Sequence, residues 1–107
     1  MHMSRIIADD HSSSPATDRA VAQYLAEAAR GDPGACFELG IAFSTGSLGL
    51  SGDLVEAHKW FNLAAVAGHD CAKTCRADIA EEMTAREIAE AQRRAREWIA
   101  AGSRRAA

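Results

Sequence analysis

Asp53-Leu-Val-Glu-Ala57-His-Lys-Trp60-Phe61-Asn-Leu-Ala64-Ala65-Val-Ala-Gly68 is the stretch of sequence that decides the fold. Two large aromatics and four small residues share one stripe at helical spacing: Ala57, Trp60, Phe61, Ala64, Ala65 and Gly68. Small residues let a neighbouring backbone approach closely, while the aromatics fill the remaining space. The stretch therefore predicts a helix pressed against other helices, as in the stacking units of repeat proteins.

The pattern of this stretch recurs weakly on both sides. Gly31-Asp-Pro-Gly-Ala35 returns as Gly68-His-Asp-Cys-Ala72, a shift of 37 residues. Ala57-His-Lys-Trp60-Phe61 returns as Ala95-Arg-Glu-Trp98-Ile99, a shift of 38 residues. A near-constant period of roughly 30 to 40 residues is typical of solenoids built from two-helix repeats.

A longer motif surrounds the central stretch: Ala35-x-x-x-Leu39-Gly40-x-x-Phe43-x-x-Gly46, then Gly49-Leu50-x-x-Asp53, then Ala57-x-x-Trp60-Phe61-x-x-Ala64-Ala65-x-x-Gly68. Residues 32–72 thus resemble one full Sel-one-like repeat, a relative of the tetratricopeptide repeat (TPR), and residues 83–98 resemble the closing segment of small bacterial proteins of that family. The chain departs from the pattern in extra hinge residues around Ser47-Leu48 and in Arg76-Ala77, which replaces a Leu-Gly pair. The resemblance implies an all-helical fold, a protein-interaction role and no catalytic residues.

Start and stop signals divide the chain into five helices. Ser14-Pro15 and Asp32-Pro33 each predict a helix start with proline in the first turn. Three later starts follow from capping residues: Asp53 with Glu56, Asp70, and Thr84 with Glu87. Gly31, Gly46, Gly68 and Gly102 are the expected ends. Outside the central stretch, the residues expected to face inward are Val21, Tyr24, Leu25, Ala28, Ala35, Leu39, Gly40, Phe43, Ala72, Cys75, Ile79, Met83, Ile88, Ala91, Ala95, Trp98 and Ile99.

We therefore predict an all-α fold, a short antiparallel helix-pair solenoid of about five helices resembling a TPR superhelix. One complete repeat is flanked by degenerate ones. The expected organisation is a loose arm over residues 1–14, a helical repeat domain over 15–102 and a frayed tail over 103–107. Because about three repeats are normally needed for a stable solenoid, the flanking helices should be integral to folding.

Charge and composition narrow the class of function. The formal net charge is −3, with residues 1–83 acidic and residues 84–107 basic, which argues against nucleic acid as a partner. No apolar run approaches the roughly 20 residues that span a bilayer, and the first ten residues do not resemble a secretory signal. Three cysteines, an odd number, do not suggest a disulfide framework. We therefore expect a cytoplasmic protein that binds no membrane.

The cysteines and histidines offer an alternative function, metal binding. Cys71 and Cys75 are four residues apart on one predicted helix, and His69 precedes them. Such ligands can share one metal ion, but a structural zinc site usually needs four, and His58 or Cys36 would have to complete it. Cys75 also lies on the expected core stripe, and unpaired cysteine is often buried. We therefore predict no metal site, and keep a Cys/His metal-binding helical protein as the alternative.

Catalysis is not expected from this sequence. A cysteine nucleophile needs a nearby base, and Cys36 has no flanking histidine. The chain lacks the motifs of serine hydrolases, zinc proteases and phosphate-binding loops, and Gly46, Gly49 and Gly52 are not followed by Gly-Lys-Ser/Thr. We predict neither an enzyme nor a cofactor.

The remaining expectation is a protein-binding surface. In helical repeats the first helix of each pair tends to line the concave surface, which here is the helix that starts at Pro33. The candidate contact residues are Phe37, Glu38, Ile41, Ser44 and Thr45. A groove there would hold a partner protein or peptide, although Phe37 and Ile41 could instead pack on a neighbouring helix. The short stack also leaves a homodimer open, through an exposed face of the first or last helix.

Overall fold

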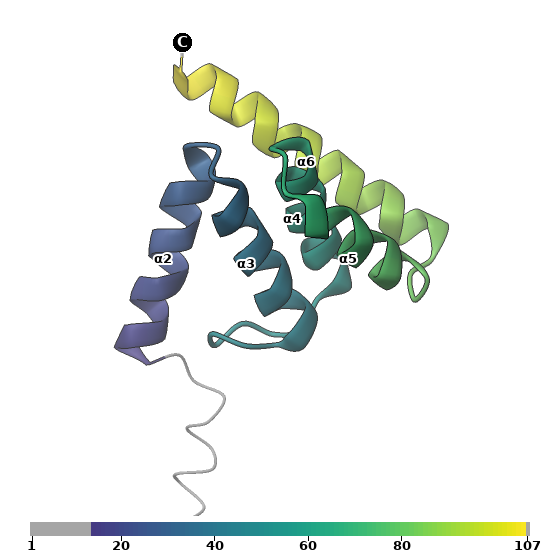
Figure 1. The fold of residues 1–107 in the computed structure, drawn as a ribbon, viewed down its shortest axis with the longest axis horizontal. Helices are drawn as coiled ribbons and strands as arrows, with labels where there is room; N and C mark the ends of the chain where they lie inside the picture. The colour runs from purple at the N-terminus through teal and green to yellow at the C-terminus, as the bar shows by residue number, and fades with distance from the viewer. Residues whose placement is uncertain (1–13, 107) are drawn as a thin grey trace, which may run out of the picture.

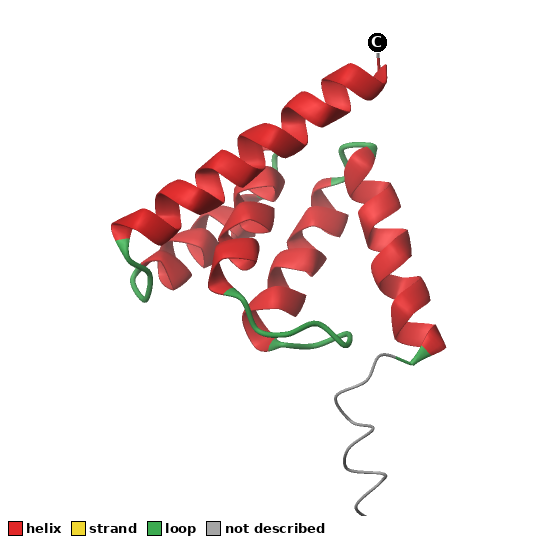
Figure 2. Ribbon diagram, turned by 180° about the vertical axis from the view of Figure 1, so that it is seen from behind, coloured by secondary structure: helices red, strands yellow, loops and turns green. Residues whose placement is uncertain are grey.

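Five α-helices joined by short loops make up the described part of the chain (Figures 1 and 2). The computed structural model describes residues 14–106, with side chains described up to Ser103. The helices are α2 (Pro15–Ala29), α3 (Pro33–Thr45), α4 (Leu54–Val66), α5 (Asp70–Ala80) and α6 (Ala85–Ala106). Residues 14–106 contain no strand, so the predicted all-α class is confirmed for them. Residues 1–13 of the predicted arm lie outside the described residues.

Side-chain caps determine where α2 and α3 begin. The Ser14 hydroxyl accepts the Thr17 N–H at 3.1 Å, and the Thr17 hydroxyl accepts the Ser14 N–H at 2.9 Å. A carboxylate oxygen of Asp32 accepts the N–H of Gly34 at 2.9 Å and that of Ala35 at 3.3 Å. Caps of this kind satisfy N–H groups that have no partner inside the helix, and each is worth about 1 kcal/mol. Both predicted starts are therefore confirmed.

The starts of α4 and α5 differ from the predicted capping patterns. Asp53 caps α4 by accepting the Glu56 N–H at 3.1 Å, but its own N–H donates to the carbonyl of Phe43 at 2.9 Å. The reciprocal half of the predicted capping box is therefore absent, and the Glu56 carboxylate pairs with Arg94 instead. Asp70 is the first residue of α5, because the helix begins one residue earlier than predicted and His69 takes the cap position without a side-chain bond.

The capping box that opens α6 forms as predicted. The Thr84 N–H donates to a Glu87 carboxylate oxygen at 2.8 Å, and the Glu87 N–H donates to the Thr84 hydroxyl at 3.1 Å. The predicted end at Gly102 is wrong, since α6 continues to Ala106. The frayed tail over residues 103–107 stays a prediction. Glycine inside a helix costs only about 1 kcal/mol, and no proline follows to force a stop.

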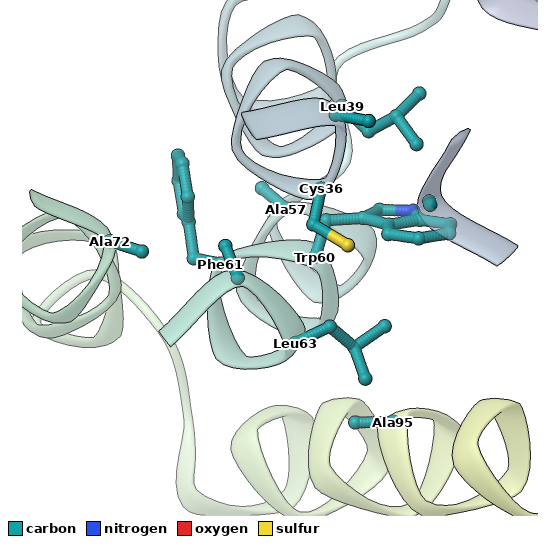
Figure 3. Packing of buried hydrophobic residues seen from close by; sticks show 11 residues of the cluster. Cys36, Leu39, Ala57, Trp60, Phe61, Leu63, Ala72 and Ala95 are labelled. Carbon is teal, nitrogen blue, oxygen red and sulfur yellow. The ribbon is translucent and has the colours of Figure 1, made fainter. Parts of the chain in front are cut away.

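The core is centred on α4, which packs against α3, α5 and α6, while α2 packs chiefly on α3. Trp60 is 2% exposed and Phe61 is 1% exposed, which confirms both as core residues. Figure 3 shows Phe61 on the side of α4 that faces Ala72, and Leu63 directed toward Ala95 of α6. The aromatics of one helix thus fill the spaces beside three neighbours, as the alternation of large and small residues predicts.

Gly40 of α3 lies directly against the Phe61 ring of α4. A Cβ atom at this position would lie 2.5 Å from Cδ1 and 2.6 Å from Cε1 of the Phe61 ring. Such distances are far inside van der Waals contact, so the ring occupies the space that any larger residue would need. Gly40 is therefore required by packing.

Outside the central stretch, the predicted inward stripes are wrong at two positions. Leu25 on α2 is 38% exposed and Ile99 on α6 is 47% exposed. Leu25 lies on α2 and Ile99 on α6, and within residues 14–106 each of these helices packs chiefly on one neighbour. A further group of predicted inward residues is half-buried: Val21, Tyr24, Phe43, Cys75, Ile79, Met83, Ile88 and Trp98.

Helix α6 is the longest described helix, with 22 residues. Charged side chains recur along it, including the exposed Arg86, Arg96 and Glu97. Neither α6 nor any other helix within residues 14–106 combines the length and the apolar character needed to cross a lipid bilayer.

Candidate partner-binding site

The predicted contact residues lie along α3, but they differ in exposure. Glu38 is exposed, and Phe37 and Ile41 are half-buried against the core. The hydroxyls of Ser44 and Thr45 both donate to the carbonyl of Ile41, at 3.0 and 2.9 Å. Phe37 and Ile41 therefore pack on neighbouring helices, as the alternative interpretation has it. Glu38 and Thr45 are the predicted contact residues that are exposed to solvent.

Phe37 is held by two aromatic neighbours. Its ring stacks on His69 with 4.1 Å between ring centroids and an interplanar angle of 11°. It also meets Phe61 at 5.7 Å in a tilted arrangement. Offset-stacked and tilted rings at these distances attract each other beyond their buried area. Phe37 thus links α3 to α4 and to the start of α5, a structural role that leaves less of the ring available to a partner.

An apolar groove lies on a different part of the molecule, where the ends of α2 and α4 meet the second half of α6. Its volume is about 200 Å³. None of its lining residues is charged. They are Ala28, Ala29, Gly31, Cys36, Leu63, Val66, Ala67, Trp98, Ile99 and Gly102.

All three exposed large hydrophobic residues of the described chain lie at this groove or beside it. Val66 is 70% exposed and Ile99 is 47% exposed, and both line the groove. Leu25 is 38% exposed, and it lies one helical turn before Ala28 and Ala29 on the same face of α2. A contiguous exposed apolar patch on a soluble domain marks an interaction surface more often than isolated exposed residues do.

The sequence interpretation missed this groove because it assigned Leu25 and Ile99 to the core and passed over Val66. One signal was present. Leu63 and Ala67, four residues apart at the end of α4, form a second apolar stripe outside the one that contains Trp60 and Phe61. That stripe faces α6, and Leu63 is 6% exposed.

An aromatic pair and a cation hold α6 against α4 beside the groove. The rings of Trp60 and Trp98 meet edge to face, with 4.8 Å between centroids. The Lys59 ammonium lies 4.4 Å from the Trp60 centroid and 5.3 Å from the Trp98 centroid. Cation–π contacts of this kind are worth about 0.5–1 kcal/mol at partly exposed sites. This arrangement fixes Trp98 as one wall of the groove.

Ion pairs continue the contact between α4 and α6. The Arg94 guanidinium donates to Glu56 on α4 at 2.7 Å and to Glu90 on its own helix at 2.8 Å. Arg93 pairs with Glu90 and with Glu97. Hydrogen bonds from Arg93 and Arg94 lower the pKa of Glu90 to about 2. Arg94 thus joins α6 to α4 in addition to its pair within α6.

The cysteines do not converge on a metal site. Cys36 is buried, Cys75 is half-buried and Cys71 is exposed. Burial, reinforced by Asp32, raises the pKa of the Cys36 thiol to about 11, which keeps the thiol neutral. Within residues 14–106, no three side chains of His, Cys, Asp or Glu come together as a metal-binding group. The described part of the chain therefore supplies no ligand set for the metal-binding alternative.

Comparisons with protein-family models, with curated proteins and with solved structures find no match for this chain.

Proposed function

We propose that this chain is a Sel-one-like helical-repeat protein that binds another protein through the apolar groove between α2, α4 and α6. The observation that carries the proposal is that Val66 and Ile99, two of the three exposed large hydrophobic residues within residues 14–103, line one uncharged groove, while the third, Leu25, lies one helical turn before Ala28 of its lining. The proposed mechanism is presentation of a rigid surface without bond-making chemistry.

The chemistry of the groove indicates what kind of partner it receives. At about 200 Å³ it is smaller than the sites of about 300–1,000 Å³ that enclose small molecules. Its lining offers no charged side chain to fix a polar metabolite. It suits one or two large apolar side chains projecting from one face of a partner helix, the helix-in-groove mode of recognition.

The walls of the groove favour such a partner energetically. Burying the exposed parts of Val66 and Ile99 contributes up to roughly 1.5–3 kcal/mol for each side chain. Trp98 forms a wall that is already held by Trp60 and Lys59, so little additional ordering is needed on binding. A preformed wall and two exposed aliphatic side chains are the features expected at the centre of a binding surface.

The surface predicted along α3 remains a second place for contact. Glu38 is exposed there, whereas Phe37 and Ile41 pack against the core. A partner on this face would therefore meet a polar surface. A partner bound on α3 would touch Glu38, whereas a partner bound in the groove would touch Val66 and Ile99.

Photo-crosslinking at single positions separates these surfaces. The crosslinking amino acid benzoylphenylalanine is introduced at Val66, at Ile99, at Glu38 or, as a control, at the exposed Glu82, and the native cell is irradiated. We expect one shared adduct from Val66 and Ile99 and none from Glu82. The captured protein is then purified and its affinity for the chain is measured with Val66→Asp, which should weaken binding at least about tenfold because a charge enters the apolar groove.

Two outcomes contradict the proposal. Adducts from Glu38 without adducts from Val66 or Ile99 would place the partner on α3. An affinity that Val66→Asp leaves unchanged would show that the groove is not the contact surface, provided that circular dichroism confirms that the variant is folded.

A further inference from the structure

A buried histidine lies in the interface between α4 and α5. His58 of α4 is 4% exposed, and its Nδ1 atom is buried without a hydrogen-bond partner within the described residues. On the facing helix, Arg76 donates to the Asn62 side chain at 2.6 Å. The interface thus contains one fixed cation and one side chain that can become a second.

We propose that His58 makes the docking of α5 on α4 pH-sensitive: a proton on His58 puts a second positive charge opposite Arg76, and α5 separates from α4. Asn62 lies four residues after His58 on the same face of α4, and Arg76 of α5 reaches that face by donating to Asn62. Asn62, which holds Arg76 in place, is neutral and cannot compensate for a second cation. Two like charges in a mostly buried interface repel each other more strongly than they would in water.

The direction of the pH dependence follows from burial. Burial first, and then the charge of Arg76, lower the pKa of His58 below its ordinary value of 6.5. The detached helix leaves the imidazole in water, where it binds a proton near pH 6.5. The contribution of neutral His58 to the stability of the docked state is therefore fully present above about pH 6.5. This contribution is lost as the pH falls through 6.5 toward the lower pKa that His58 has in the docked state.

Helix α5 is held chiefly by one neighbouring helix. Its main packing is against α4 alone. It has 11 residues, with Ala72 as its one fully buried residue, and its first turn lacks a side-chain cap. Local opening is easiest where few apolar contacts hold an element in place. Release of α5 uncovers the side of Phe61 that faces Ala72 (Figure 3), and leaves the packing of α4 on α3 and α6 in place.

Hydrogen exchange read by mass spectrometry tests this proposal on the full chain. Exchange of α5 amides is compared at about pH 5 and about pH 7.5, after correction for the intrinsic pH dependence of exchange. We expect protection in α5 to fall at least about tenfold at the lower pH, while protection in α3 stays constant. A tenfold change corresponds to a difference of about one unit between the pKa of His58 in the detached and docked states.

Matched variants assign the effect to His58. His58→Phe keeps a ring in the interface but cannot titrate, so its α5 protection should be equal at both pH values. His69→Phe is the control, because it removes the other described histidine and retains an aromatic ring against Phe37. It should keep the pH dependence of the wild type. Arg76→Gln removes the opposing cation and should reduce the loss of protection at low pH.

The proposal is overturned if α5 protection in the wild type is the same at both pH values, or if it falls equally in His58→Phe. Should His58→Phe fail to fold, as judged by circular dichroism, Arg76→Gln decides the question. If α5 protection at low pH falls as much in Arg76→Gln as it does in the wild type, the proposal is overturned.

Discussion

Replacing Gly40 with alanine tests the packing of α3 on the Phe61 ring of α4. The new Cβ atom would meet the Phe61 ring at 2.5 Å, so the ring or the backbone of α3 must move. Phe61 is 1% exposed and its ring also meets Phe37, which leaves it little room to rotate. Overpacking of this kind costs about 1–3 kcal/mol. Alanine recovers up to about 1 kcal/mol because it is a better helix former than glycine.

We therefore expect Gly40→Ala to lose about 1–2 kcal/mol of unfolding free energy, which corresponds to a fall of roughly 4–16 °C in melting temperature. Urea titration followed by circular dichroism measures the loss. Gly34→Ala is the matched control on the same helix, because its Cβ atom would meet only the Asp32 carboxylate oxygen at 3.3 Å. The control should stay within about 0.5 kcal/mol of the wild type.

A second variant shows whether the clash is with Phe61. Phe61→Leu shortens the side chain, so the double variant Gly40→Ala with Phe61→Leu should be more stable than the sum of the two single effects predicts. Gly40→Ala at wild-type stability, or strictly additive effects in the double variant, would refute the packing described for α3 and α4.

Three further predictions concern the core, the thiols and the link between α4 and α6. Trp60→Ala should lose about 3–5 kcal/mol in a urea titration, and a loss below about 1 kcal/mol would contradict its place in the core. At about pH 8, Ellman's reagent should modify the exposed Cys71 rapidly and the buried Cys36 only on unfolding, and equal rates would contradict the burial of Cys36. Glu56→Gln should lose up to about 1 kcal/mol of unfolding free energy, and adding Arg94→Ala to that variant should cost little more. Additive losses in the double variant would show that the two side chains do not interact.

The sequence was most informative about local structure. The caps at Ser14, Asp32 and Thr84 involve residues two or three positions apart, so their spacing in the chain is also their spacing in space. The same holds for the stripe through Trp60 and Phe61, since a helix places these residues against its neighbours whatever the rest of the chain does. These features could be predicted because short-range geometry determines them.

The candidate site depended on longer-range packing. Leu25 and Ile99 carry the apolar pattern of buried residues, yet they are exposed, because among residues 14–106 the helices α2 and α6 each pack chiefly on one neighbour. Glu56 meets Arg94, which lies 38 residues away, so no local motif could reveal that pair. Glycine is common at helix ends, yet α6 continues through Gly102. Sequence spacing does not show which faces remain uncovered.

Calorimetric titration of the captured partner into the chain tests the proposed binding site most directly. The account predicts a negative heat-capacity change on binding, the signature of buried apolar surface, and an affinity at least about tenfold weaker for Val66→Asp than for the wild type. Glu38→Gln should bind as the wild type does. Binding that is lost with Glu38→Gln and retained with Val66→Asp would contradict the account, and would place the partner on α3.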